Sequence, residues 1–429
     1  MTQKTQILNL NRFDPDSAHA APELLRARMR HAGASSVLFY AEPVEMVRGE
    51  GVWLTSAEGR RYLDVYNNVP SVGHCHPKVA EAIAKQSATL TTHTRYLNRV
   101  VETYAERLLA TFPAPLSNLV MTCSGTEAND LAMRIAEAGT GGRGFIVTEA
   151  AYHGNSAAVN EISPSAWKSR GPAAHVRLVP APKAPGFDAA VAAAAQSLDA
   201  AGVGVAALIV DSIFSSDGIF ADPAGFLAPA VAAVRAAGGL FIADEVQPGF
   251  GRTGTGLWGF ARHGVVPDIV TMGKPMGNGY PMAGMVTRPD LLAQFCEETG
   301  YFNTFGGNPV AAAAGLAVLD VIRDEGLVEN AREVGAYFRA GLAELAARAP
   351  VMGEVRGAGL FIGLDFIDPE RGTPDAAQAG RTINALKQKG ILIGAAGLYG
   401  YTLKIRPPLP FSRDNVDFFL QVLAEVMAG

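Results

Sequence analysis

Between residues 78 and 330, short apolar runs alternate with stretches that have a helical pattern. Five of these runs have the length and aliphatic content of buried strands, namely residues 118–121, 144–147, 207–210, 240–243 and 269–272. Such alternation predicts a mostly parallel sheet with helices on both faces. We therefore expect an α/β fold in which residues 73–330 form one large domain.

The pattern changes on both sides of this region. Residues 44–66 alternate and turn, which predicts a small antiparallel meander. Towards the C-terminus we expect a long helix over 327–347, one strand over 355–366, a helix over 376–389, strands over 391–393 and 402–406, and a final helix. Residues 1–72 and 331–429 should together form a smaller α/β domain.

Composition excludes several classes of protein. A chain of 429 residues with 48% hydrophobic residues can bury one large core or two domains. Its formal net charge of -5 provides no general basic field for nucleic acid. No apolar run reaches membrane-spanning length, and no apolar signal core follows Met1. The cysteines Cys75, Cys123 and Cys296 form neither a disulfide framework nor a zinc motif, so we expect no metal and a reducing, cytoplasmic setting.

Two of the predicted strands lead into ionisable residues that are costly to bury. Residues 240–243 lead into Asp244, and residues 269–272 lead, after one glycine, to Lys274. The carboxyl ends of the strands are where α/β sheets bind ligands. A lone lysine at the end of a buried strand is costly unless it has a function. The function that fits is a Schiff base to pyridoxal phosphate (PLP), with the acid keeping the pyridine nitrogen protonated.

Two further strand ends carry residues suited to that cofactor. Ser124, Gly125 and Thr126 follow a strand and open a helix, where free backbone N–H groups bind anions, although an ordinary helix N-cap explains the same residues. Tyr152, next to His153, could stack on a flat ring, and its simpler interpretation is a packed loop aromatic. Each segment alone favours the simple interpretation, but the order of all four on an alternating scaffold favours the cofactor site.

These segments resemble the class III aminotransferase family of PLP enzymes, and the resemblance runs nearly from end to end. The most specific matches are residues 124–129, 152–154, 244–254, 273–281, 303–309 and 407–409. By position, the resemblance implies that Lys274 forms the Schiff base and carries protons. It also implies that Asp244 pairs with the pyridine nitrogen and that Gln247 reaches the phenolic oxygen. Val246 and Tyr152 would then pack on the two faces of the ring.

The family also implies how the phosphate of the cofactor is held. Gly125 and Thr126 would bind it, and we count the adjacent Ser124 and the loop residue His153 among the cofactor-binding residues. Thr304 would complete the phosphate site from the neighbouring subunit. The resemblance therefore implies a homodimer with shared active sites.

Two departures from the amino-acid transaminases of the family concern the substrate. The ornithine and 4-aminobutyrate enzymes carry an arginine three positions before a Pro-Pro pair, where this chain has Lys404. They also carry a glutamate that masks the arginine, where this chain has Ser216, and here Arg406 stands directly before Pro407. Lysine cannot reproduce the bidentate grip of arginine on a carboxylate. The absence of both residues is consistent, because a glutamate that covers the arginine has no function when the arginine is absent.

A different branch of the family, the phospho-lyases acting on phosphoethanolamine and phosphohydroxylysine, shares this pattern. The matching stretches are residues 67–69, 72–77, 95–97 and 403–408. The resemblance implies a reaction that expels phosphate from the neighbouring carbon and gives an aldehyde and ammonia. A phosphorylated amine needs cationic groups near its reacting end. Lys404, Arg406, Arg95 and His74 are the candidates, and each could equally be a surface or structural charge.

We therefore predict a PLP-dependent amine lyase of the phospho-lyase kind, acting on a small primary amine. The alternative is an ω-transaminase that passes the amino group to a keto acid such as pyruvate. A third hypothesis, a PLP-binding protein without turnover, is disfavoured because Lys274, Asp244 and the phosphate loop are all intact.

Overall fold

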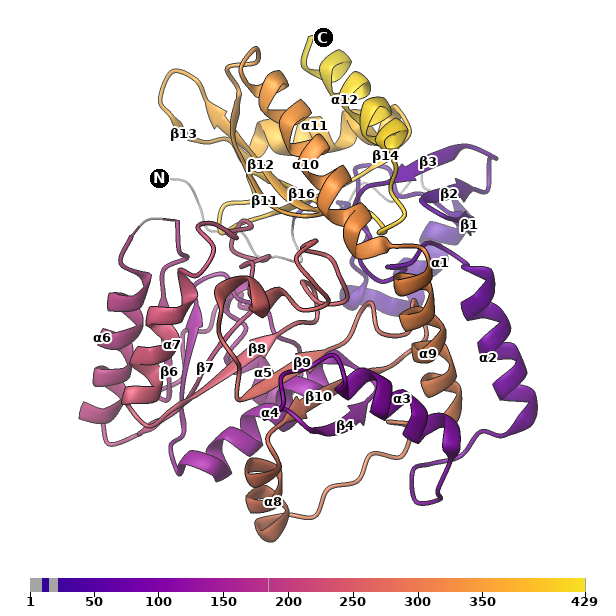
Figure 1. Cartoon of the computed structure of the whole chain (residues 1–429). Coiled ribbons are helices and arrows are strands. Elements are labelled where there is room, and N and C mark those ends of the chain that lie inside the picture. Colours follow the sequence, from indigo (N-terminus) through magenta and orange to yellow (C-terminus); the bar gives the residue numbers. More distant parts are fainter. Residues whose placement is uncertain (1–9, 15–21, 184, 429) are drawn as a thin grey trace.

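The computed structural model describes residues 10–14, 22–183 and 185–428, and it has the α/β fold class that the sequence predicts (Figure 1). Residues 1–9 and 15–21 of the expected N-terminal segment lie outside the described residues. Helices cover a large central sheet, and a smaller group of strands and helices made from both ends of the chain lies against its upper edge in Figure 1.

The central sheet has seven strands in the order β4-β10-β9-β8-β7-β5-β6. Their bounds are β4 Asn118–Thr122, β5 Gly144–Thr148, β6 Val176–Val179, β7 Val205–Val210, β8 Leu240–Asp244, β9 Ile269–Met272 and β10 Ala283–Thr287. The pairs β5–β6, β5–β7, β7–β8 and β8–β9 are parallel, whereas β10 is antiparallel to both of its neighbours. The prediction of a mostly parallel sheet is therefore confirmed.

All five strands predicted for this sheet are present, and two more were not predicted. β6 is a half-buried edge strand, so it lacks the continuous apolar run by which the others were found. β10 begins with Ala-Gly, and both residues are depleted in strands. Every residue of β5, β7, β8 and β9 is buried, as expected for strands that are covered on both faces.

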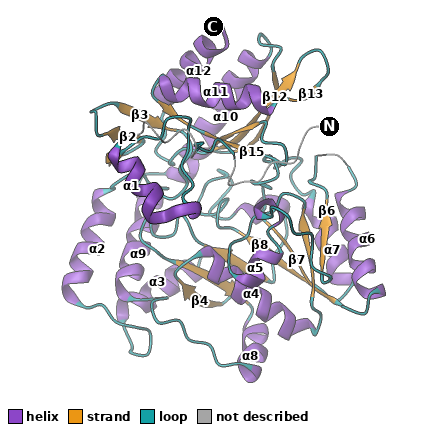
Figure 2. Cartoon of the chain, turned by 180° about the vertical axis from the view of Figure 1, so that it is seen from behind, coloured by secondary structure: helices purple, strands orange, loops and turns teal. Residues whose placement is uncertain are grey.

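The helices that accompany the central sheet occupy its two faces (Figures 1 and 2). They are α2 Pro77–Thr89, α3 Arg99–Leu109, α4 Gly125–Thr140, α5 Ala157–Glu161, α6 Phe187–Ala200, α7 Leu227–Ala236, α8 Pro289–Glu298 and α9 Pro309–Asp324. Short 3-10 turns cover Gly33–Ser35, Pro164–Ala166 and Gly259–His263. Helix α4 matters most for function, because its first turn lies directly after β4, at the end of the sheet where the strands lead into loops.

Two smaller sheets are built from the two ends of the chain. One has the order β1-β2-β3-β14 and contains the predicted meander, with β14 parallel to β3. The other has the order β11-β12-β16-β15, and β13 pairs with β12. The strand bounds are β1 Met46–Glu50, β2 Trp53–Ser56, β3 Arg61–Asp64, β11 Met352–Ala358, β12 Phe361–Asp368, β13 Thr373–Pro374, β14 Ile391–Leu392, β15 Gly394–Ala396 and β16 Thr402–Ile405.

The helices of this part are α1 Glu23–Ala32, α10 Leu327–Ala346, α11 Ala376–Gln388 and α12 Arg413–Ala428. The pairing of β14 with β3 places the N- and C-terminal segments side by side, as expected. The domain limits 1–72, 73–330 and 331–429 stay a prediction.

The prediction of a single strand over residues 355–366 is wrong, because this stretch is the hairpin of β11 and β12. The chain turns at Gly359, whose φ is +53°. A Cβ atom there would lie 2.4 Å from the carbonyl oxygen of Arg252, so a larger residue would collide with the backbone. The turn is hidden in the sequence because Ala358 and Leu360 flank the glycine without any Asn, Asp or Pro.

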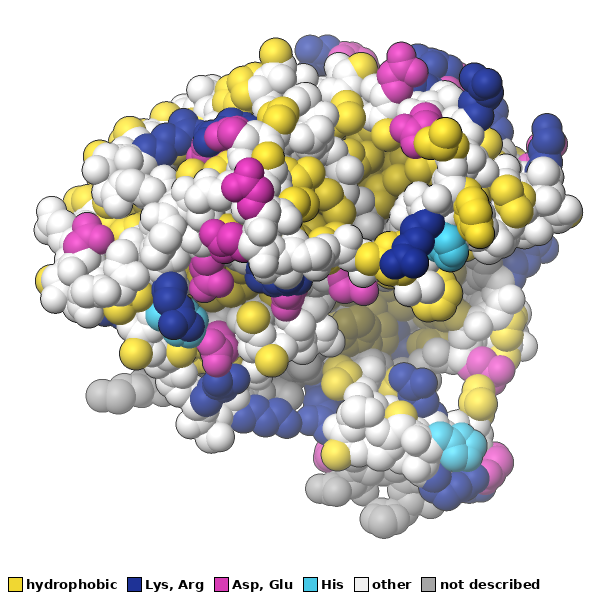
Figure 3. Space-filling view, turned by 90° about the horizontal axis from the view of Figure 1, so that it is seen from below, with side chains coloured by type: hydrophobic (Ala, Val, Ile, Leu, Met, Phe, Trp, Pro, Cys, Tyr) yellow, Lys and Arg dark blue, Asp and Glu magenta, His cyan; other side chains and the backbone are white. Residues whose placement is uncertain are grey.

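The surface carries both signs of charge. On the face shown in Figure 3, Lys and Arg side chains lie among acidic and apolar ones. Within the described residues, no helix combines the length and the apolar character needed to cross a membrane.

A buried ion pair ties the segment after β7 to the C-terminal hairpin. Arg356 on β11 donates to Asp365 on β12 through both Nη atoms, at 2.8 Å each. It also donates to the carbonyl oxygens of Gly218, at 2.6 Å, and Ile219, at 2.9 Å. The ring of Phe220 lies 4.7 Å from the guanidinium carbon. One side chain thus fixes the path of a loop that borders the cavity described below.

Replacing this arginine should destabilise the protein strongly. Arg356→Ala leaves Asp365 buried without its charged partner, and we expect the free energy of unfolding to fall by about 3–5 kcal/mol. The matched control is Arg332→Ala, because Arg332 and Glu329 form an exposed pair on α10 worth about 0–1 kcal/mol. Thermal and denaturant unfolding measure the loss of stability in each variant. Equal unfolding midpoints in the two variants would contradict a stabilising role for the buried Arg356–Asp365 pair.

Candidate active site

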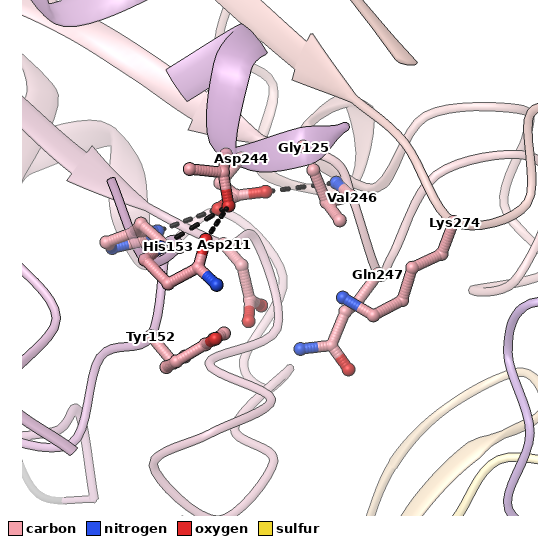
Figure 4. Close-up of a pocket in the computed structure, with 11 residues that line it drawn as sticks. Gly125, Tyr152, His153, Asp211, Asp244, Val246, Gln247 and Lys274 are labelled. Atoms are coloured by element: carbon pink, nitrogen blue, oxygen red, sulfur yellow. Dashed lines mark hydrogen bonds and ion pairs between the residues drawn. The ribbon is translucent and has the colours of Figure 1, made fainter. Parts of the chain in front are cut away.

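A cavity of about 200 Å³ lies at the carboxyl ends of the central strands (Figure 4). Its walls include Gly125 and Thr126 from the start of α4, Tyr152 and His153 after β5, Asp211 after β7, Asp244, Val246 and Gln247 at and after β8, and Lys274 after β9. The structure therefore brings together most of the residues that the sequence assigns to the cofactor.

Asp244 ends β8 and is 4% exposed. One carboxylate oxygen, Oδ2, lies 2.7 Å from Nδ1 of His153 and accepts a hydrogen bond of 3.1 Å from Nδ2 of Asn129. The other, Oδ1, accepts from the backbone N–H of Val246 at 3.0 Å. These partners compensate the burial of the carboxylate and fix its orientation at the cavity wall.

Asn129 on α4 is a positioning residue to which the sequence analysis gave no role. Besides its bond to Asp244, its Nδ2 atom donates to the carbonyl oxygen of His153 at 2.8 Å. Its Oδ1 atom accepts from the hydroxyl of Thr271 on β9 at 2.6 Å. The available signal was a polar residue on the otherwise apolar, fully buried face of a helix.

The start of α4 separates Ser124 from the cavity. The Ser124 hydroxyl accepts from the backbone N–H of Glu127 at 3.3 Å, and the Glu127 carboxylate accepts from the backbone N–H of Ser124 at 2.9 Å, which makes a capping box. Ser124 is thus an N-cap and does not line the cavity. Gly125 and Thr126 do line it, and a Cβ atom on Gly125 would lie 3.0 Å from Val246.

Lys274 and Gln247 enter the cavity from one side, with Tyr152 on the other (Figure 4). Lys274 keeps solvent contact through the cavity, although it lies deep among protein atoms. Burial, and then the charge of Arg406, lower the pKa of Lys274 to about 8, while Asp244 opposes the shift. A lysine with this pKa supplies the neutral amine that nucleophilic attack requires.

Asp211 lines the same cavity and was missed as a site residue. Its carboxylate accepts from the backbone N–H groups of Ile213, at 2.9 Å, and Ser215, at 2.8 Å. Burial, followed by the opposing hydrogen bond from Ser215 and the charge of Asp244, leaves the pKa of Asp211 raised. The signal was present, because Asp211 ends a buried apolar run just as Asp244 does.

Two of the four predicted substrate cations, Lys404 and Arg406, lie close to this cavity but do not themselves line it. Lys404 on β16 is 3% exposed, and Arg406, just beyond it, is 6% exposed. Burial, and then the charges of Arg406 and Lys274, lower the pKa of Lys404 well below its usual value. Arg406 donates through Nη1 to Oε1 of Gln247 in the cavity wall.

The other two, His74 and Arg95, do not line the cavity of their own chain, and neither does Thr304. His74 Nε2 lies 2.7 Å from the fully buried carboxylate of Asp64, so its ring has a structural partner. Arg95 is exposed, with its guanidinium 4.3 Å from the ring of Phe302. Thr304 is exposed in the same region of the surface.

Known proteins resemble the chain over almost its whole length. The Aminotransferase class-III family model matches residues 39–427. The chain is 41% identical to the alanine–glyoxylate aminotransferase 2-like protein of Drosophila melanogaster, over 95% of this chain and 87% of that protein. It is 37% identical to ethanolamine-phosphate phospho-lyase homolog 1 of Caenorhabditis elegans, over 94% of this chain and 93% of that protein.

A solved structure resembles it equally well. A phospholyase from Arthrobacter, in complex with phosphoethanolamine, superimposes with a TM-score of 0.92 at 45% identity, covering 95% of this chain and 100% of that one. The fold, the cavity and these similarities agree, and the chain therefore belongs to the class III aminotransferase family of PLP-dependent enzymes.

Proposed function

We propose that the protein is a phospho-lyase acting on a phosphorylated amino alcohol such as phosphoethanolamine. The observation that carries this proposal is a buried basic side chain, Lys404, which lies close to the cavity of Lys274 and has no hydrogen bond or ion pair within the described residues. A dianionic phosphate compensates buried positive charge better than any neutral substituent does. The similarity to a phospholyase solved with phosphoethanolamine supports the same conclusion.

The cavity suits PLP by its chemistry. Asp244 offers a buried, oriented carboxylate for the pyridine nitrogen, and Val246 and Tyr152 offer apolar surfaces for the ring. Gly125 and Thr126 offer backbone N–H groups at a helix N-terminus for the phosphate. When bound, PLP supplies an electron sink that stabilises negative charge on the substrate carbon bonded to nitrogen.

In the proposed reaction, Lys274 would hold the cofactor in the resting enzyme. Once the substrate amine has taken its place, the released amine of Lys274 would take the proton from the carbon that bears the substrate nitrogen. The phosphate then leaves the neighbouring carbon with the electron pair of its C–O bond. Lys404 stabilises the negative charge of the leaving phosphate. Water completes the balance, since one phosphoethanolamine and one water give acetaldehyde, ammonia and inorganic phosphate.

The second candidate function is amino transfer to a keto acid such as pyruvate. The similarity to an alanine–glyoxylate aminotransferase 2-like protein favours it. Amino transfer would use the same cavity and the same lysine, Lys274. The two functions differ in what leaves the substrate, and only the lyase requires a cation at the phosphate.

We also propose a homodimer in which Thr304 completes the neighbouring site. Thr304 lies on a surface where large apolar side chains are exposed, among them Phe305 at 71% and Leu97 at 97%. Exposed apolar surface of this kind is typical of protein contacts. The cysteines are all free, which fits the proposed cytoplasmic setting.

Phosphoethanolamine, supplied to the PLP-loaded protein without a keto acid, should release inorganic phosphate and ammonia in equal amounts over many turnovers. Colorimetric phosphate and enzymatic ammonia assays measure the two products together. Amino transfer to pyruvate without any phosphate release would refute the lyase and establish the transaminase.

Lys404→Met should raise KM for phosphoethanolamine at least about tenfold, because a charge-assisted hydrogen bond to the phosphate is lost. Lys85→Met, on the exposed face of α2, is the matched control and should leave KM unchanged. An unchanged KM in both variants would show that the phosphate is bound elsewhere.

The pKa of Lys274 predicts how PLP attaches to the PLP-free protein. Only the neutral amine attacks the cofactor, and its fraction reaches one half at the pKa of about 8 and approaches one above it. The rate of attachment, followed by absorbance, should therefore rise through about pH 8 and then level off. A rate that continues to rise towards about pH 10.4 would show an ordinary lysine.

A further inference from the structure

The side-chain amide of Gln247 can present either of two opposite groups to the cavity. Its oxygen accepts hydrogen bonds, and its NH₂ group donates them. Arg406 Nη1 contacts the amide at Oε1. Arginine has no acceptor, so the end of the amide that faces Arg406 must be the oxygen. The NH₂ group is then directed towards the cavity, on the side of Tyr152 (Figure 4).

Arg406 is itself held by fixed backbone. Its Nε atom donates to the carbonyl oxygen of Tyr66 at 3.0 Å, and its backbone N–H donates to the carbonyl oxygen of Val65 at 2.7 Å. The guanidinium carbon lies 4.9 Å from the ring centroid of Tyr66 and 5.7 Å from that of Phe361. A buried guanidinium with these partners is a rigid anchor for the Gln247 amide.

The backbone of Gln247 is anchored as well. Asn68 Nδ2 donates to the carbonyl oxygen of Gln247 at 2.9 Å, and Asn68 Oδ1 accepts from the buried Arg252 at 3.0 Å. Gln247 is therefore held at its backbone by the N-terminal segment and at its side chain by the C-terminal segment.

Lys404 contrasts with Arg406. Across the described part of the chain, the Lys404 side chain has no hydrogen bond or ion pair, and its Nζ atom lies 5.5 Å from the centroid of the Phe361 ring. Of the two cations, Lys404 is the one left free to bind a substrate group.

We propose that Arg406 is a positioning residue, which orients Gln247 so that its NH₂ group, and not its oxygen, faces the phenolic oxygen of bound PLP. The proposal rests on the proposed function, and on the family resemblance that places Gln247 at the phenolic oxygen. A donor stabilises the ionised phenolic oxygen, whereas an amide oxygen in the same place would repel it. Arg406 then acts on the cofactor through Gln247, and Lys404 binds the substrate phosphate.

The test is a double-mutant cycle read from the absorbance of the PLP-loaded enzyme. Titration with pH gives the midpoint at which the cofactor band changes. Arg406→Met removes the donor and frees the amide, so the midpoint should rise by about one pH unit when Gln247 is present. In the Gln247→Leu background, where no amide remains to be oriented, the same substitution should shift the midpoint by much less.

Equal shifts in the two backgrounds would overturn the proposal, because they would show that the charge of Arg406 acts on the cofactor directly. No shift in either background would overturn it too. Arg406→Lys is the conservative control, since lysine also donates without accepting, and it should restore a midpoint close to that of the unmodified enzyme.

This outcome is separable from that of the proposed reaction. Phosphate release is measured on the same preparations, and a wild-type enzyme that shows the expected cycle without releasing phosphate would refute the lyase alone. A lyase with equal shifts in both backgrounds would refute the role of Arg406 alone.

Discussion

The site depends on one buried carboxylate. Asp244 sits at the end of β8 with little solvent, and an unpaired charge there would cost several kcal/mol. Its three partners come from α4, from the loop after β5 and from its own turn. Asn129 holds two of these elements in register with β9 through Thr271. The hydrogen bonds that orient Asp244 for the cofactor nitrogen therefore also fix the relative positions of β8, β9 and the start of α4.

Positive charge dominates the opposite side of the cavity. Burial and then the charge of Arg406 lower the pKa of both Lys274 and Lys404, Lys274 lowers that of Lys404 further, and Asp211 opposes both shifts. A protein gains nothing in stability from such crowding, because the buried side chains of Lys404 and Arg406 lose hydration. The cost is understandable if an anion completes the charge balance during turnover. The cofactor phosphate is bound elsewhere, at the start of α4, in the arrangement proposed above, so the substrate is the anion that remains.

The sequence predicted the strand ends well and the closer packing poorly. Asp244 and Lys274 were found because each follows an apolar run, and the same rule applied to residues 205–210 would have found Asp211. The pairing of His74 with Asp64 depends on the turn of the chain between them, which no spacing reveals. Thr304 is exposed, and a sequence motif does not distinguish a residue of the subunit's own cavity from one that completes the cavity of a neighbouring subunit.

The two ends of the chain meet at Gln247, and this explains why a cofactor cavity built by the central sheet needs the terminal segments. β14 pairs with β3, and just beyond them the backbone of Arg406 bonds to Val65. This places Asn68 and Arg406 on either side of the same glutamine. The cofactor wall after β8 and β9 belongs to the central sheet, whereas Lys404 stands on β16 of a terminal sheet. In the proposed arrangement, the cofactor and the substrate phosphate are therefore held by separate sheets of one protein, and Arg406 joins the two through Gln247.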